Sequence, residues 1–209
     1  MSKYIINLIK QGEHQTLDFK HSITDSKKIA RSLVAFANTD GGTLLIGVKD
    51  NGSIVGVDSE EEYYMIEAAA QMYCKPEIPF HVTKWNINGK AVLEVVVKPS
   101  KKRPHKAPDK SGDYKVFVRV KDENIVATSI QLKIWKADRH RKSIQMILSS
   151  KENFLFDYLK TNPKITIGQF SRLAFISRID AENTLINLTV LGMIRYIATQ
   201  EEEYFALNP

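Results

Sequence analysis

The chain has 209 residues, of which 43% are hydrophobic and 26% are charged. This composition is typical of a globular protein and excludes a disordered, collagen-like or coiled-coil chain as the main architecture. Its 30 lysines and arginines exceed its 24 acidic residues and give a formal net charge of +6. Such an excess suits a polyanionic partner, although many basic proteins bind none.

The cysteine and histidine content and the lack of a long apolar run limit the cellular compartment and the metal sites that we expect. Cys74 is the single cysteine, which excludes an internal disulfide framework and a multi-cysteine zinc site. The histidines show no metal-binding spacing. No apolar run approaches the ~20 residues that cross a bilayer, and the N-terminus has no cleavage pattern. We therefore expect a cytoplasmic protein with no membrane partner, in which Cys74 is a buried small hydrophobe.

Hydrophobic periodicity predicts the elements of the first two thirds of the chain. Gly41-Gly42 ends the first long helix, since a glycine pair stops helices. Asn51-Gly52 favours a type I′ turn that returns residues 53–57 as an antiparallel strand, and Asn88-Gly89 is the turn of a second hairpin. The expected elements are a short lead at 5–9, strands at 16–20, 43–49, 80–87, 90–97 and 114–120, and helices at 25–37, 59–73 and 129–136.

A polar, cation-rich segment at residues 136–142, KADRHRK, is the expected domain boundary. We therefore predict one domain at 1–138 and a second at 139–209. The second domain has expected helices at 143–159, 167–174 and 177–191 and expected strands at 193–199 and 203–207. This order predicts a small winged helix-turn-helix domain.

Most of the excess charge lies in residues 98–115, KPSKKRPHKAPDKSGDYK, which we call the basic loop. It holds seven lysines and arginines against two acids, and its three prolines and one glycine exclude a helix. One interpretation is a solvated connection between two strands. The other is a flexible basic arm that contacts a phosphate backbone and releases its counterions. The candidate nucleic-acid contacts are Lys101, Lys102, Arg103 and Lys106.

The stretch NTDGGTLLIGVKDNGSIVG contains no GxxxxGK[ST] and is therefore not a P-loop. Turn formation accounts for Gly41-Gly42 and Asn51-Gly52 but leaves Asn38, Asp50 and Gly56 unexplained. Together with GEHQTLDFK and YKVFVRV, the stretch resembles the AlbA-type domain shared with Schlafen proteins, over residues 10–135. The resemblance implies an α+β fold with a mixed sheet and a nucleic-acid-binding role. Related domains are also called divergent AAA-type, but nothing in these residues supports ATP hydrolysis.

The same resemblance implies a ribonuclease site. Schlafen ribonucleases use three carboxylates, which correspond here to Glu13, Asp18 and Asp50, with Asp18 standing where Glu is commoner. Carboxylates brought together could hold Mg²⁺ or Mn²⁺ and activate water against a phosphodiester. The alternative is that they are polar residues of a turn, a strand and a hairpin. Lys20 could pair with Asp18 or contact phosphate. Arg119 is expected to face inward or into a cleft and is a further candidate nucleic-acid contact.

The helix predicted at 177–191 has two interpretations. We expect Ile179, Leu185, Leu188 and Leu191 to be buried. Exposed Arg178, Asn183 and Asn187 suit base edges in a major groove, and Thr184 is expected beside them. Acids on this helix and at residues 201–203 would instead repel phosphate and suit a protein contact or dimerisation.

Three functions therefore remain open. The first is a nucleic-acid-binding protein, in particular a DNA-binding transcriptional regulator, with DNA or RNA as partner. The second is a metal-dependent endoribonuclease, although no enzyme activity is the simpler expectation. The third is a protein-interaction module, such as a homodimer, without nucleic acid.

Overall fold

The computed structural model describes residues 2–143 and 148–208 and divides into two compact units, Met1–Ala127 and Thr128–Pro209. The division lies upstream of the boundary expected at 138/139. The reason is helix α4 (Ser129–Asp138), whose Ile130 and Ile134 are buried in the core of the C-terminal unit. Residues 144–147 of the helix predicted at 143–159 lie outside the described residues.

The N-terminal unit is built on a four-stranded sheet. Its strands are β1 (Leu17–Lys20), β2 (Gly42–Ile46), β3 (Phe80–Ile87) and β4 (Lys90–Val97), in the order β1-β2-β4-β3. The β1–β2 pair is parallel, whereas β2–β4 and β3–β4 are antiparallel. The expected α+β class with a mixed sheet is therefore confirmed.

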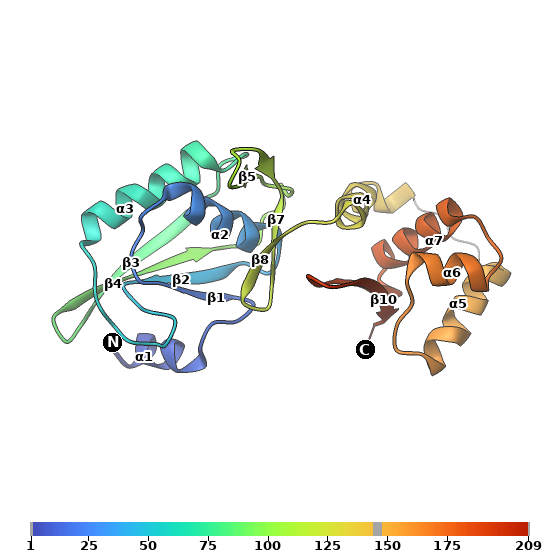
Figure 1. Ribbon diagram of the computed structural model, residues 1–209, viewed down its shortest axis with the longest axis horizontal. Helices are drawn as coiled ribbons and strands as arrows, with labels where there is room; N and C mark the ends of the chain where they lie inside the picture. The colour runs from blue at the N-terminus through green and yellow to red at the C-terminus, as the bar shows by residue number, and fades with distance from the viewer. Residues whose placement is uncertain (1, 144–147, 209) are drawn as a thin grey trace. The chain divides into compact units, whose positions relative to one another are not determined.

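Helices cover both faces of this sheet (Figure 1). Helices α2 (Ser26–Asn38) and α3 (Ser59–Ala68) lie on one face, and α1 (Ser2–Gln11) lies on the other. A π-helical turn, Ala69–Tyr73, continues α3. Each strand sends alternate side chains to the two faces and so contributes to two cores.

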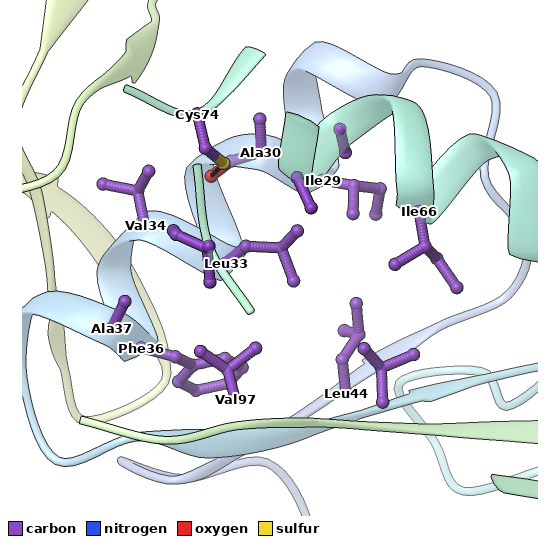
Figure 2. Close-up of a cluster of buried hydrophobic side chains, with 14 of the residues drawn as sticks. Ile29, Ala30, Leu33, Val34, Phe36, Ala37, Leu44, Ile66, Cys74 and Val97 are labelled. Carbon is purple, nitrogen blue, oxygen red and sulfur yellow. Dashed lines mark hydrogen bonds between the residues drawn. The ribbon is translucent and has the colours of Figure 1, made fainter. Parts of the chain in front are cut away.

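The larger core lies between α2, α3 and the sheet. Figure 2 shows α2 directing Leu33 and Phe36 toward the sheet residues Leu44 and Val97, while Ile66 approaches from α3. Cys74 is buried in the same core, as expected, and burial raises the pKa of its thiol to about 12. The thiol therefore stays protonated and serves as an apolar filler.

Two short strand pairs complete the N-terminal unit. Strand β5 (Ala107–Pro108) pairs with β6 (Tyr114–Lys115), and β7 (Phe117–Val120) pairs with β8 (Glu123–Val126). The single strand predicted at 114–120 is thus interrupted at Val116 and belongs to two separate pairs.

The two Asn-Gly turns fold differently. Asn88 and Gly89 have φ values of 52° and 79°, the left-handed pair that a type I′ turn needs, and join β3 to β4. Asn51 keeps a negative φ, and its side chain accepts from the Ser53 amide at 3.0 Å. The return strand predicted at 53–57 is therefore wrong: an isolated bridge between Val48 and Ile54 is what the structure describes there.

The C-terminal unit contains α4, a 3₁₀ turn (Arg141–Ser143), three further helices and one antiparallel strand pair. The further elements are α5 (Ser150–Thr161), α6 (Ile167–Leu173), α7 (Arg178–Val190), β9 (Ile194–Ala198) and β10 (Glu203–Leu207). Leu155, Phe170, Leu185 and Phe205 form the centre of its core. Across residues 2–143 and 148–208, no helix has the length and apolar composition needed to cross a membrane.

Candidate nucleic-acid interface

The basic loop presents its lysines to solvent. Lys101, Lys102 and Lys106 are exposed, and Arg103 is half-buried. Within the part of the chain that the structure describes, these three lysines form no ion pair with an acid. An ion pair inside the loop joins Lys115 to Asp113 at 3.8 Å. The loop is therefore a cationic surface whose charge is largely not neutralised by the protein, as a phosphate-binding surface requires.

Two buried side chains anchor the loop. Asn38, at the C-terminal end of α2, donates to the carbonyl oxygens of His105 and Phe117 at 2.9 and 2.8 Å, and its Oδ1 accepts from the His105 amide at 2.8 Å. The His105 ring in turn contacts the Pro76 carbonyl at 2.8 Å and Ser100 Oγ at 2.7 Å. Asn38 and His105 are each 1% exposed, so these hydrogen bonds are shielded from water.

Backbone pairing fixes the second half of the loop. Lys106 and Lys75 exchange two backbone hydrogen bonds of 2.7 and 2.8 Å, and the β5–β6 pair follows. The Asp109 side chain accepts from the amides of Ser111 and Asp113 and so holds the turn. The basic loop is therefore anchored to the fold at His105, at Lys106 and at the Asp109 turn. The Arg103-Pro104-His105 interruption of the lysine run carries the anchor of a folded loop.

A cleft of about 1010 Å³ lies beside the basic loop. The loop contributes Lys98, Lys101 and Lys102, and aromatic lining comes from Tyr63 of α3 and Phe80 of β3. Neither aromatic was predicted from the sequence, because the fold brings α3, β3 and the loop together and no local pattern links them.

Two of the three predicted carboxylates lie together at β1. Glu13 Oε1 accepts from the Phe19 amide at 2.8 Å. Burial raises the pKa of Glu13, the neighbouring Asp18 carboxylate raises it further, and the Phe19 amide opposes the shift. Asp18 itself is only 3% exposed, in contact with two cations.

These two cations are Arg119 and Lys20. Arg119 is 2% exposed, and its Nη2 lies 3.2 Å from Asp18 Oδ1 while the guanidinium lies 5.3 Å from the Phe36 ring centre. The inward orientation is confirmed, but the predicted nucleic-acid contact does not fit a side chain so deeply buried. Lys20 Nζ lies 2.9 Å from Asp18 Oδ2, so Lys20 pairs with the carboxylate.

Asp50 is an exposed residue of the turn after Val48. In residues 2–143 and 148–208, no group of three or more His, Cys, Asp or Glu side chains is placed to hold a metal ion. The expected Mg²⁺ or Mn²⁺ site of Glu13, Asp18 and Asp50 is therefore not assembled. Asp18 forms ion pairs with Arg119 and Lys20 instead, and these pairs explain why a carboxylate is buried on this strand.

Helix α7 exposes the three predicted base-contact residues, Arg178, Asn183 and Asn187. Two other expectations are wrong: Ile179 is 73% exposed, and Thr184 is 6% exposed. The buried stripe consists of Ala181, Thr184, Leu185 and Leu188, at positions i, i+3, i+4 and i+7 of the helix. Ile179 lies off this stripe.

The turn between β9 and β10 is acidic, as the sequence indicates. Glu202 pairs with Lys164 at 2.6 Å, and Glu203 accepts from the Tyr196 hydroxyl at 2.6 Å. Burial and the hydrogen bond to Glu203 raise the pKa of Tyr196. The Lys164 pair ties the turn to the rest of its unit, and the Tyr196 contact joins β9 to β10. The carboxylates at this turn would repel phosphate.

The fold and the site define the N-terminal unit as an α+β domain with a mixed sheet and an anchored basic loop. The Schlafen, AlbA_2 family matches residues 13–128, more than half of the 209-residue chain. The protein therefore belongs to the Schlafen AlbA_2 family.

Two solved structures resemble part of the chain. The DIP2311 protein from Corynebacterium diphtheriae matches with 21% identity and a TM-score of 0.43, over 58% of this chain and 24% of that one. The N-terminal domain of a protein described as ATP-dependent DNA helicase RecG-related, from Nitrosomonas europaea, matches with 21% identity and a TM-score of 0.38, over 60% of this chain and 95% of that one. With TM-scores below 0.5, neither likeness carries an argument about this chain.

Proposed function

We propose that this protein binds nucleic acid through the basic loop. The observation that carries the proposal is the set of exposed lysines, Lys101, Lys102 and Lys106, which form no ion pair in the described part of the chain and lie on a loop anchored by Asn38 and His105. Membership of the Schlafen AlbA_2 family supports the same role.

The anchoring supports binding energetically. A folded loop loses less conformational entropy when it meets a ligand than a flexible arm would, so more of the electrostatic attraction contributes to affinity. Lysine contacts with phosphate orient a nucleic acid without distinguishing its sequence. The proposed binding is therefore salt-dependent and tolerant of sequence.

A charge-matched pair of variants tests this function. Replacing Lys101, Lys102 and Lys106 by Ala removes three unpaired cations. Replacing Lys133, Lys160 and Lys164 removes three exposed cations that pair with Glu182, Asp157 and Glu202. Binding to labelled single-stranded and duplex DNA is measured by fluorescence anisotropy at low salt.

We expect the loop variant to bind roughly tenfold more weakly or worse, because it loses phosphate contacts. The control variant, with the same net charge, is expected to stay within about twofold of the wild type. Equal losses in the two variants would show that net charge, rather than the loop, determines binding.

A second candidate function concerns the C-terminal unit. Its helices and strand pair follow the order of a winged helix, and Arg178, Asn183 and Asn187 are exposed on α7, which favours base contacts by a DNA-binding transcriptional regulator. Against this, Phe175 is 96% exposed with a φ of 53°, and Ile179 is 73% exposed beside it, which favours a protein contact or a homodimer.

Two double variants separate these roles of the C-terminal unit. If α7 contacts bases, Asn183→Ala with Asn187→Ala abolishes any preference between DNA sequences, and Phe175→Ser with Ile179→Ser does not. If the unit contacts protein, the Phe175 and Ile179 double variant lowers the apparent mass in analytical ultracentrifugation, and the asparagine variant leaves it unchanged.

A further inference from the structure

The cleft beside the basic loop has an aromatic wall. Tyr63 projects from α3 and is 40% exposed, although it is a large side chain. Its ring centre lies 6.3 Å from that of Phe80, with the ring planes at 54°. Phe80 is partly buried at the start of β3, so it supports Tyr63 from the protein side. An exposed aromatic ring held in this way offers a face for stacking.

Charge is divided between the elements that form the cleft. The cations Lys98, Lys101 and Lys102 all belong to the basic loop, whereas the acids Glu67 and Glu77 come from α3 and from the segment before β3. Phosphate would be attracted to the loop side. The carboxylates are hydrogen-bond acceptors, which suit the amino groups on the edges of nucleobases.

The size of the cleft also indicates its ligand. At about 1010 Å³, it matches the upper end of the ~300–1,000 Å³ typical of sites for organic molecules. A surface that bound only phosphates would not need the aromatic lining of Tyr63 and Phe80. Cations along a groove with an aromatic ring beside them are the combination that binds single-stranded nucleic acid.

We propose that this cleft binds an unpaired nucleobase of a single strand, with the base against Tyr63 and the adjoining phosphates on Lys98, Lys101 and Lys102. This inference rests on the proposed nucleic-acid binding by the basic loop and specifies its substrate class. A base within a duplex is stacked and paired, so its ring cannot reach Tyr63. The cleft therefore favours single strands over duplexes, while the outer face of the loop contacts both.

The test uses the full chain, a short single-stranded DNA containing 2-aminopurine, and the same strand in a duplex. The variant is Tyr63→Leu, which removes the ring but keeps an apolar side chain. Its matched control is Tyr64→Leu, because Tyr64 is the next residue of α3, is 67% exposed and does not line this cleft. The Tyr64 ring contacts that of Tyr63 edge-on at 6.3 Å, and leucine keeps an apolar side chain at that contact. Thermal unfolding verifies that both variants are folded.

We expect Tyr63→Leu to weaken single-strand binding by roughly 5- to 150-fold, the range for loss of one stacked base, and to leave duplex binding within about twofold. Binding should quench 2-aminopurine fluorescence in the wild type and in Tyr64→Leu, but not in Tyr63→Leu. A further arm needs no variant: a strand with abasic sites keeps its phosphates and should bind the wild type more weakly than the intact strand.

Unchanged single-strand affinity in Tyr63→Leu, or equal affinity for intact and abasic strands, would overturn the base-binding inference. The proposed function would survive that result if the Lys101, Lys102 and Lys106 variant still lost affinity for both strand forms. If that lysine variant bound normally, the proposed function itself would fail.

Discussion

Lys101 and Lys102 of the basic loop differ from three exposed lysines of the C-terminal unit in what they face. In the C-terminal unit, Lys133, Lys160 and Lys164 each lie within ion-pair distance of an acid on the same unit. In the basic loop, Lys101 and Lys102 are exposed without such a partner in the described residues. Two regions with similar residues therefore have different electrostatic surfaces.

This comparison indicates that the number of cations is a poor guide to a binding surface. An exposed ion pair contributes little to stability, but it does neutralise the charge that a phosphate would meet. The folded basic loop combines charge that is not neutralised with a fixed backbone. Each of the following experiments changes one feature of this comparison: a cation, the anchor of the loop, the exposed face of α7 or a carboxylate.

The largest expected effect concerns a cation that faces inward. Replacing Arg119 with Met leaves the buried Asp18 carboxylate without its guanidinium partner, and we expect a loss of about 3–5 kcal/mol in the free energy of unfolding. Lys20→Met is the control, since Lys20 is more exposed and should cost about 1 kcal/mol or less. Denaturant unfolding measures both variants.

If Arg119 served nucleic acid instead, Arg119→Met would retain wild-type stability and lose affinity. That outcome would contradict the view that inward cations stabilise the fold while outward cations bind nucleic acid.

The next effect concerns the anchor. Asn38→Ala removes three buried hydrogen bonds and leaves backbone groups of His105 and Phe117 without a partner. We expect a loss of roughly 2–4 kcal/mol, because each unsatisfied buried group costs about 1–3 kcal/mol. Hydrogen exchange should become faster in the basic loop, and nucleic-acid affinity should fall although every lysine is retained.

A matched control for the anchor is Asn162→Ala in the C-terminal unit. Asn162 also donates from its side chain to a backbone carbonyl, that of Tyr158, but it is half-buried. Equal nucleic-acid affinity in Asn38→Ala and the wild type would contradict the view that anchoring contributes to binding.

A smaller effect is expected on α7. Replacing Asn183 and Asn187 by Ala should change affinity for DNA of arbitrary sequence by less than about twofold, because amide side chains contribute little to phosphate attraction. Anisotropy titrations of the full chain measure this. A tenfold loss would place the main contact on the C-terminal unit and reverse the comparison.

The smallest effect concerns the pH dependence of Glu13. Its pKa is raised above the ordinary value of 4.5, so the folded state binds this proton more tightly than the unfolded state. The stability of the wild type therefore decreases as pH rises through the folded pKa. Glu13→Gln keeps an acceptor for the Phe19 amide and removes the charge of this half-buried side chain.

We therefore expect Glu13→Gln to gain stability relative to the wild type as pH increases from about 4 to 7. Thermal unfolding at several pH values measures the difference. A difference that shrinks with rising pH would contradict the assigned direction. It would also indicate that Glu13 is ionised in the folded state, as a metal ligand must be.

Much of the fold was predictable because it depends on local pattern. Residues 80–97 alternate around Asn88-Gly89, whose left-handed turn closes the hairpin, and the structure has both strands at the expected residues. Asn51-Gly52 has the same letters but a different outcome, because Asn51 uses its side chain to accept from Ser53. A dipeptide favours a turn type, and its surroundings decide the conformation.

The site was less predictable because its contacts are long-range. His105 lies in a run of lysines with no apolar periodicity, and its anchor, Asn38, is 67 positions away in the sequence. The family resemblance correctly indicated an inward Arg119. It did not indicate that the carboxylates implied for a metal site would divide between a buried ion pair and an exposed turn.

The most direct test of the central claim is photo-crosslinking of the full chain to single-stranded DNA, followed by mass spectrometry of the crosslinked peptides. We predict crosslinks in the basic loop, around Lys98, Lys101 and Lys102, and at Tyr63 beside the cleft. They should decrease as salt increases, since phosphate contacts release counterions. Crosslinks confined to α7, with none in residues 98–115, would contradict the account.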